Sequence, residues 1–439
     1  MPLAIPYRSD RRYLTGVDWI IGTLDCMTQR ATGAGNTSQI LLELEGHMDE
    51  ARLCEIVHAF AARFPALSGR PARDWLNLAP FWKMDRQAGH CAVETIPDQS
   101  SAEAAIAALC RALNTPFSSA RDHVTFRLVH VGPDRSYLGM VFDHRLFDAR
   151  GAELFLDRLA AFAAGDTATS PPEITLPVRE PYLSHWGEKF AAGRNVNRAI
   201  RSCADVRPAC LPIPSGRPGF QYHFEMFDAA QSRSLTETAF ALGGYLVKMP
   251  YLLALAAQAV DRLFAARGHT PEHYLIPVSI DRRSARADSQ SLFFNHISFL
   301  HFLISRRDLQ STESLVQSIT RQMYEQTKAR LPEDFEQTLL LMRILPVGVL
   351  AAFSQRMFSG NFGTFAFSYL GETGCRARQF LGHRILNLIH TPRVSTPPGL
   401  GLFLNEFDGR INVTAASLEG LLTPDEAASL THSFQPANA

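Results

Sequence analysis

The sequence carries no excess of charge of either sign. Its 439 residues include 43 lysines and arginines and 43 aspartates and glutamates, which gives a formal net charge of zero. Proteins whose main partner is nucleic acid or an anionic membrane surface usually show a basic surplus or patch. The balanced charge supports neither kind of partner, and we expect neither.

Long apolar runs are also absent. The first twelve residues turn polar after five positions, without the apolar segment of a secretory signal. The two most apolar helical segments, 250–264 and 339–358, are interrupted by polar or charged residues such as Asp261 and Arg343 and by Pro346. Neither is expected to span a bilayer. We therefore predict a cytoplasmic protein without integral membrane association.

Paired cysteines are missing as well. The cysteine count is odd, the residues are scattered, and no Cys-x-x-Cys pair occurs. This pattern favours reduced thiols in a cytosolic protein over a disulfide framework. The seven residues are Cys26, Cys54, Cys91, Cys110, Cys203, Cys210 and Cys375.

Several common cofactor and catalytic motifs do not occur. There is no Gly-x-Gly-x-x-Gly, no Gly-x-Ser-x-Gly, no Walker loop, and no repeat of 20 to 50 residues. His269 and His273 have the spacing of a helical metal pair, but Pro271 lies between them and no third ligand is near in sequence. We therefore predict no metal site.

The chain is long enough for two domains of ordinary size, each with its own core. Residues 165–181 contain several prolines and show no periodicity, which is the composition of a linker. We place the domain boundary there, which gives one domain over residues 1–170 and a second over residues 171–439.

Apolar periodicity predicts helices and strands in both halves. The clearest amphipathic helix has Leu53, Ile56, Val57 and Phe60 at i, i+3, i+4 and i+7. Further helices are predicted at 101–113, 148–164, 232–242, 250–266 and 315–328, at 339–358 with a hinge at Pro346, and after the capping box at 423–426. Strands are predicted at 39–45, 222–227, 276–280 and 297–304, with a hairpin of 400–406 and 411–416 around Asp408-Gly409.

The most informative stretch is 141–151, which sets His144 and Asp148 four residues apart after an apolar run. The segments before it predict a β-hairpin, and the helical spacing after it places Asp148 at or near an N-cap. His144 is thus expected at a strand-to-helix junction, which holds a side chain rigidly and leaves it accessible, as a general base requires. Spacing alone favours the simpler interpretation, in which Asp148 caps a helix and His144 is a satisfied, partly buried polar residue.

The segment Asp143-His144-Arg145-Leu146-Phe147-Asp148-Ala149 resembles the His-His-x-x-x-Asp-Gly motif of the CoA-dependent acyltransferase superfamily. This superfamily includes nonribosomal-peptide condensation domains, alcohol acetyltransferases and wax-ester synthases. Asp143 stands in place of the first histidine and Ala149 in place of the glycine, whereas the second histidine is retained as His144. If the backbone at the glycine position needs a positive φ, an alanine there would be strained.

Other superfamily motifs follow in the same order. Residues 44–49, with the following helix that ends in Arg63-Phe64-Pro65-Ala66-Leu67, resemble the superfamily's opening strand and helix. The strand Ile276-Pro277-Val278-Ser279, with Arg282 and Arg283 after it, resembles a second motif. A late strand motif is resembled by the segment Phe365-Ala366-Phe367-Ser368-Tyr369-Leu370-Gly371. The ordered set is more specific than any one motif. It implies an α/β fold of two chloramphenicol-acetyltransferase-like lobes, with mixed sheets and flanking helices, arranged as a V-shaped pseudo-dimer around a central tunnel.

The resemblance also implies roles for the motif residues. His144 would be the catalytic base that takes a proton from an acceptor hydroxyl or amine as that group attacks an acyl thioester. Asp148 would point away from the substrate and pair with Arg282 or, as the second choice, Arg283. Asp143 would hydrogen-bond the loop that the motif's first histidine holds.

Further positions are candidates for contact with the substrate or an oxyanion. Ser368 would donate towards the thioester, or else hydrogen-bond within its sheet. Asn295 resembles a superfamily asparagine at the strand crossing between the halves, and we expect it to be structural rather than catalytic. Arg282, Arg283 and Arg286 would meet phosphates of CoA or of a pantetheine arm, although the outermost is more simply a solvated loop residue.

The function implied is that of a stand-alone condensation-like acyltransferase. It would move an acyl or aminoacyl group from a CoA or carrier-protein thioester to a small alcohol or amine acceptor, in natural-product or lipid biosynthesis. The acyl-CoA or phosphopantetheine thioester would be a co-substrate, with no tightly bound cofactor and any carrier protein on a separate chain. The alternatives are a catalytically silent relative that docks a carrier protein or partner enzyme, and a thioester hydrolase that uses water as acceptor.

Overall fold

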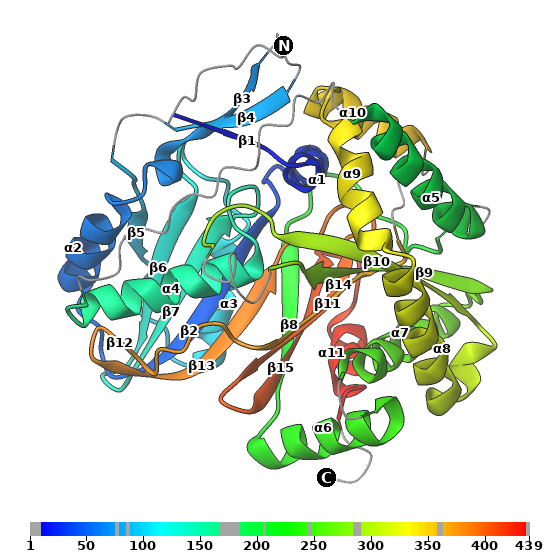
Figure 1. Ribbon diagram of the computed structural model, residues 1–439. Coiled ribbons are helices and arrows are strands. Elements are labelled where there is room, and N and C mark those ends of the chain that lie inside the picture. Colours follow the sequence, from blue (N-terminus) through cyan, green and yellow to red (C-terminus); the bar gives the residue numbers. More distant parts are fainter. Residues whose placement is uncertain are drawn as a thin grey trace.

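The computed structural model describes residues 10–74, 79–84, 88–166, 185–204, 208–244, 247–283, 291–357 and 363–435. Within these ranges helices and strands alternate in an α/β arrangement with two lobes (Figure 1). The helices are α1 (Gly16–Thr32), α2 (Glu50–Ala61), α3 (Ala102–Ala112), α4 (Ala149–Ala163), α5 (Trp186–Ala204), α6 (Ala229–Gly243), α7 (Met249–Ala266), α8 (Thr312–Lys328), α9 (Leu331–Met342), α10 (Val347–Met357) and α11 (Pro424–His432).

The strands form two six-stranded mixed sheets and one small three-stranded sheet. They are β1 (Arg11–Tyr13), β2 (Thr37–Glu45), β3 (Arg70–Asp74), β4 (Ala79–Lys83), β5 (Ala92–Thr95), β6 (Val124–Val131), β7 (Arg135–Asp143), β8 (Phe220–Met226), β9 (His273–Asp281), β10 (Ile297–Ser305), β11 (Ala366–Glu372), β12 (Gln379–Phe380), β13 (His383–Pro392), β14 (Leu400–Phe407) and β15 (Arg410–Leu418). The predicted α/β class is confirmed.

The first large sheet has the strand order β12-β13-β2-β7-β6-β5. Its central strand β2 is buried on both faces along most of its length because both faces are covered. Ile40 and Leu42 enter the core formed with α2 and α4, whereas Leu41 packs on the opposite face with Leu109 of α3. The predicted hairpin is present, since β6 and β7 pair antiparallel over their whole length.

The second large sheet has the order β10-β9-β11-β14-β15-β8, in which β11 runs parallel to both of its neighbours. Helix α7 is buried along most of its length beneath this sheet, and Pro250 lies in its first turn as predicted. The β14–β15 hairpin turns at Asp408 and Gly409, whose φ angles of 53° and 71° explain why this pair predicts a hairpin.

Two strands of the second half, β12 and β13, belong to the sheet of the first half. β13 pairs antiparallel with β2, with Pro392 opposite Ser38, and the side-chain amides of Asn387 and Asn412 then link β13 to β15 of the other sheet. The lobes are therefore joined by backbone pairing as well as by the chain between them. The predicted boundary between 170 and 171 lies outside the described residues, so the division at that point stays a prediction.

Local patterns missed two long helices. α1 begins with a capping box of Thr15 and Asp18, but its buried face includes polar residues and therefore lacks the apolar stripe that reveals a helix. α5 lies in the segment whose sequence shows mainly polar residues and arginines.

The predicted break at Pro346 is confirmed, and α9 begins eight residues earlier than the apolar run at Leu339. Among the described helices, none alone is long and apolar enough to cross a membrane. α9 and α10 meet that criterion only when they are taken together, and they bend by 118° at their break.

Candidate active site

His144 lies immediately after β7, in a tight turn between the strand and α4. The carbonyl of Asp143 accepts hydrogen bonds from the backbone N–H groups of Leu146 (2.9 Å) and Phe147 (3.1 Å). The backbone of His144 itself is fixed on both sides, because its N–H donates to the Asn36 carbonyl (3.3 Å) and its carbonyl accepts from Asn295 Nδ2 (3.0 Å). The predicted strand-to-helix junction is confirmed.

The imidazole of His144 is half-buried and has no hydrogen-bond partner among the described residues. Its Nδ1 is buried. Buried polar atoms in native proteins nearly always have a partner. A half-buried histidine on a rigid turn with an unpaired nitrogen is suited to accept a proton from a bound molecule.

Asp143 serves the turn and not the ring of His144. Its carboxylate accepts from the backbone N–H and the guanidinium of Arg145 (2.9 and 2.7 Å) and lies 2.8 Å from His123 Nδ1. His123 Nε2 in turn lies 2.8 Å from the Gly69 carbonyl. The His123 ring therefore links the Asp143 carboxylate to the Gly69 carbonyl.

The environment of Asp143 keeps it ionised although only 2% of it is exposed. Burial by itself would raise the pKa of Asp143, but Arg145 and His123 outweigh burial and hold that pKa below its usual value. Asp143 thus anchors the turn, as the sequence implied. Its partner His123 was not foreseen, because it lies in a loop before β6 where no periodic pattern marks it.

Asp148 is the N-cap of α4 and is saturated by donors. Its carboxylate accepts hydrogen bonds from Gly151 N (2.7 Å) and His296 N (2.9 Å). The Arg283 guanidinium donates two more hydrogen bonds to it, of 2.7 and 2.9 Å. Burial would raise the pKa of Asp148, and the charge of Arg283 reverses this effect so that the pKa lies below its usual value. Asp148 therefore fixes the start of α4 and has no free lone pair directed at a substrate.

The prediction that Arg282 is the partner of Asp148 is wrong, and its alternative Arg283 is correct. The N–H of Arg282 bonds the His296 carbonyl and prolongs the pairing of β9 with β10. Successive side chains of an extended segment point to opposite sides, so only one of the two arginines faces the motif. The guanidinium of Arg282 instead pairs with Glu333 at 3.0 Å and Glu336 at 3.8 Å. Arg286 lies outside the described residues.

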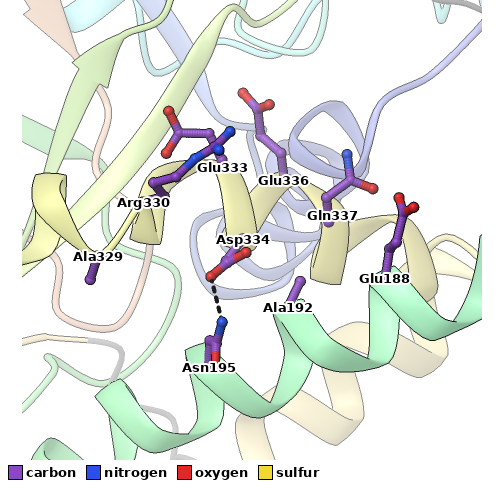
Figure 2. Close-up of a pocket in the computed structure, with 9 residues that line it drawn as sticks. All are labelled: Glu188, Ala192, Asn195, Ala329, Arg330, Glu333, Asp334, Glu336 and Gln337. Carbon is purple, nitrogen blue, oxygen red and sulfur yellow. Dashed lines mark hydrogen bonds between the residues drawn. The ribbon is translucent and has the colours of Figure 1, made fainter.

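Glu333 and Glu336 line a separate hollow of about 460 Å³ between α5 and α9 (Figure 2). Asn195 of α5 donates to Asp334 of α9 across it, over 3.1 Å. No residue of the 143–149 motif lines this hollow. The full lining is Glu188, Ala192, Asn195, Ala329, Arg330, Glu333, Asp334, Glu336 and Gln337.

Asn295 supports the backbone of the candidate site. Besides its bond to the His144 carbonyl, its backbone N–H donates to Asp18 Oδ1 (3.0 Å), and Asp18 is held by Arg12 at 3.0 Å. The structure thus brings α1 and the segment before β10 against the His144 turn. A contact of Asn295 with substrate stays a prediction.

Ser368 lies on β11 in the second sheet, where its hydroxyl accepts a 3.4 Å hydrogen bond from Ser279 of β9. This is the bonding within the sheet that the sequence allowed, and within the described residues no hydrogen bond connects Ser368 with His144. Its role towards an oxyanion stays a prediction. In the part of the chain that the structure covers, no three His, Cys, Asp or Glu side chains are placed to hold a metal ion.

Solved structures with the same arrangement were found for nearly the whole chain. The trichothecene 15-O-acetyltransferase TRI3 from Fusarium sporotrichioides aligns with a TM-score of 0.69 at 13% identity, over 97% of this chain and 95% of that one. The first condensation domain of the calcium-dependent antibiotic synthetase, in complex with a substrate analogue, gives 0.67 at 16% identity, over 98% and 95%. The starter condensation domain of rhizomide synthetase RzmA, a mutant in complex with C8-CoA, gives 0.62 at 13% identity, over 97% and 94%.

The chain has the condensation-domain fold. No family model and no curated protein sequence matches it, so at these identities the likeness concerns the architecture. The two-lobed α/β class inferred from the motifs is confirmed. The V-shaped pseudo-dimer and the tunnel stay predictions.

Within this condensation-domain fold, the position near the motif at which only glycine fits is residue 151. It lies two residues after Ala149, which stands at the motif's glycine position. Ala149 is the first residue of α4 and does not have a positive φ, so the alanine is unstrained there. At Gly151, by contrast, a Cβ would lie only 2.2 Å from the Leu292 carbonyl oxygen. The close approach of α4 to that segment requires a glycine at 151.

We expect Gly151→Ala to lower the free energy of unfolding by about 1–3 kcal/mol, because α4 must move away from Leu292. Helix propensity favours alanine by about 1 kcal/mol at most and does not offset this clash. Chemical denaturation measures the effect. The matched control is Ala149→Gly, for which we expect a loss of about 1 kcal/mol or less. Equal stability of Gly151→Ala and the wild type would contradict the close approach.

The buried carboxyls of this condensation-domain fold predict acid sensitivity. The pKa values of Asp18, Asp143, Asp148 and Glu153 all lie below their usual values, because cationic or hydrogen-bonding partners outweigh burial in each case. A depressed folded-state pKa gives stability that is fully present above the unfolded pKa of about 4 and is lost as pH falls below it.

We therefore expect the melting temperature to fall already between pH 7 and 5, because burial lowers the pKa of His296 and of His301, and to fall more steeply below about pH 4 as the carboxyls are protonated. Differential scanning calorimetry across this range measures it. The double variant Asp148→Asn/Arg283→Met removes one of these carboxyls. Its melting temperature should therefore fall less steeply with pH below about pH 4 than that of the wild type. A fall concentrated between pH 7 and 5 would show that the histidines, and not these carboxyls, control the acid response.

Proposed function

We propose that this chain is a condensation-like acyltransferase that moves an acyl or aminoacyl group from a CoA or carrier-protein thioester to an alcohol or amine. The observation that carries the proposal is the His144 imidazole, which has a buried, unpaired nitrogen on a turn held rigid by Asp143, Asp148 and Asn295. The condensation-domain fold supports it, since the neighbours include an acetyltransferase and a condensation domain in complex with C8-CoA.

In the proposed reaction His144 takes the proton of the acceptor O–H or N–H. The freed lone pair attacks the thioester carbonyl carbon, the carbon–sulfur bond breaks, and the leaving thiolate receives the proton from the imidazolium. General-base assistance of this kind typically contributes about 10² to 10⁴ in rate. The remaining acceleration would come from positioning the donor and acceptor together.

The turn residues act in this scheme through geometry. Asp143 and Asp148 are occupied by His123, Arg145 and Arg283, so neither is free to take a proton from a substrate. We infer that the thioester is a co-substrate, that no tightly bound cofactor is needed, and that any carrier protein is a separate partner. A cytoplasmic place in natural-product or lipid biosynthesis belongs to the same proposal.

The test is thiol release from a panel of acyl-CoA and acyl-pantetheine thioesters, with and without pooled amines and alcohols. Release that requires an acceptor, together with a new ester or amide in mass spectrometry, is the expected result. Release to water alone would assign the chain as a thioester hydrolase instead. A folded protein inert across the panel would contradict the transferase proposal and favour a silent docking protein.

A further inference from the structure

Arg393, the residue after β13, is a buried cation without a carboxylate partner. It is only 2% exposed, its NH2 donates to Thr32 Oγ1 over 2.6 Å, and its guanidinium lies 5.1 Å from the centre of the Phe220 ring. Its Nε and NH1 have no hydrogen-bond acceptor within the described part of the chain, and no described carboxylate forms an ion pair with it. An isolated buried charge is strongly unfavourable unless something compensates it.

Other buried polar atoms around Arg393 lack partners as well. The hydroxyls of Thr28, Thr37 and Tyr222 are buried and make no hydrogen bond as donors or acceptors with described residues. Thr28 lies one turn before Thr32 on α1, the Thr37 carbonyl accepts from the Arg393 N–H (3.0 Å), and the charge of Arg393 acts on Tyr222. We call Thr28, Thr37, Tyr222 and Arg393 the Arg393 cluster.

The Arg393 cluster lies beside the catalytic turn in the first sheet. On one side of β2, Thr37 is opposite Asp143 of β7, and on the other side Ser38 is opposite Pro392 of β13. Strands in a sheet are about 4.8 Å apart, so the backbone of residue 393 lies roughly 10 Å from that of residue 143. The Arg393 cluster and the His144 turn therefore lie at the same end of the first sheet, on strands that flank β2.

Two acidic residues, Asp25 and Glu419, act on the charge of Arg393, but neither forms an ion pair with it within the described residues. Asp25 is close enough to influence the pKa of Arg393, but its carboxylate accepts from Asn36 N at 2.7 Å and faces Arg145 at 3.5 Å. Burial lowers the pKa of Arg393, which accords with a guanidinium short of partners. The cluster thus offers unpaired donors from two guanidinium nitrogens and three hydroxyls.

We propose that the Arg393 cluster binds the carboxylate of the acceptor substrate, so that the acceptor is an amino acid or hydroxy acid whose amine or hydroxyl is presented to His144. This inference rests on the proposed function and names its acceptor class. A carboxylate would accept from the guanidinium in charge-assisted hydrogen bonds, which are roughly twice as strong as hydrogen bonds between neutral groups. Its charge would be the missing compensation for the buried cation.

The test compares each acid with its amide, which is neutral and of nearly the same size. Suitable pairs are phenylalanine with phenylalaninamide, lactate with lactamide, and 4-hydroxybenzoate with 4-hydroxybenzamide. A site built to pair a buried charge should favour at least one acid over its amide by about 10²-fold or more in kcat/KM. The same acid should raise the melting temperature of the wild type where its amide does not.

Arg393→Met should abolish both preferences, and Arg393→Lys should retain part of them. Because the guanidinium has no carboxylate partner, Arg393→Met should fold with an unchanged or higher melting temperature. The matched control Arg321→Met removes an exposed arginine of α8 and should keep the preference for the acid. A lower melting temperature of Arg393→Met with unaltered acceptor choice would make Arg393 structural and overturn the inference.

The two proposals fail in different ways. If the wild type transfers acyl groups equally to acids and amides, the inference about Arg393 is overturned and the acyltransferase function stands. If no acceptor supports transfer but an acid still stabilises the wild type and not Arg393→Met, the carboxylate site stands and the transferase proposal fails. If no acid shows either effect, the carboxylate site is overturned.

Discussion

Replacing His144 with alanine is expected to lower acceptor-dependent thiol release by about 10² to 10⁴ while the protein remains folded. The expected loss follows from the removal of the base that takes the acceptor proton. The fold should persist because the turn is held by backbone bonds at residue 144, which alanine also makes, and by the carboxylates on either side. Steady-state rates with a saturating thioester measure the effect.

The matched control for this variant is His269→Ala, which removes an exposed histidine far from the motif in sequence. It should retain the wild-type rate. Circular dichroism of both variants should match the wild type. A His144→Ala protein that is folded and as active as His269→Ala would end the general-base mechanism for this chain, and the silent docking alternative would then have to explain the unpaired histidine.

Arg283→Ala is expected to lower the free energy of unfolding by about 3–5 kcal/mol, the usual cost of leaving one member of a buried ion pair alone. The side chains of Arg283 and Asp148 are 4% and 3% exposed and share two hydrogen bonds. Without the arginine, the Asp148 carboxylate keeps only its backbone donors. Chemical denaturation, supported by the melting temperature, measures the loss.

The adjacent arginine provides the matched control. Arg282 pairs with Glu333, but both side chains are about one third exposed, so Arg282→Ala should cost about 0–1 kcal/mol. The contrast between neighbouring residues isolates the buried pair from any general effect of losing a positive charge there. Equal losses for the two variants, or a larger loss for Arg282→Ala, would show that Arg283 does not hold the motif.

The aspartate at position 143 shows how a departure from a motif can keep the motif's structural role. It bonds the backbone and side chain of Arg145 and so holds the turn. It also remains part of a carboxylate–imidazole pair, with the imidazole supplied by His123 from another segment. The departure is thus compatible with an active His144, whose ring stays free of both residues.

The sequence by itself determined much of the local structure. The spacing of Leu53, Val57 and Phe60 specified α2, Asp408-Gly409 specified a hairpin, and the capping box at Thr423 specified the start of α11. The strand, turn and cap around His144 were also predictable. Each of these depends on residues at most a few positions apart, whose periodicity and hydrogen bonds act before any distant contact forms.

Only the tertiary structure decided which distant residues meet. Arg283 and not Arg282 reaches Asp148 across 135 positions, β13 joins the sheet of the first half, and Arg393 is buried without a partner. None of these has a local pattern. They follow from which face of an extended segment is turned inward and from which strands pair, and a shift of one residue in register would exchange the buried side chains for the exposed ones.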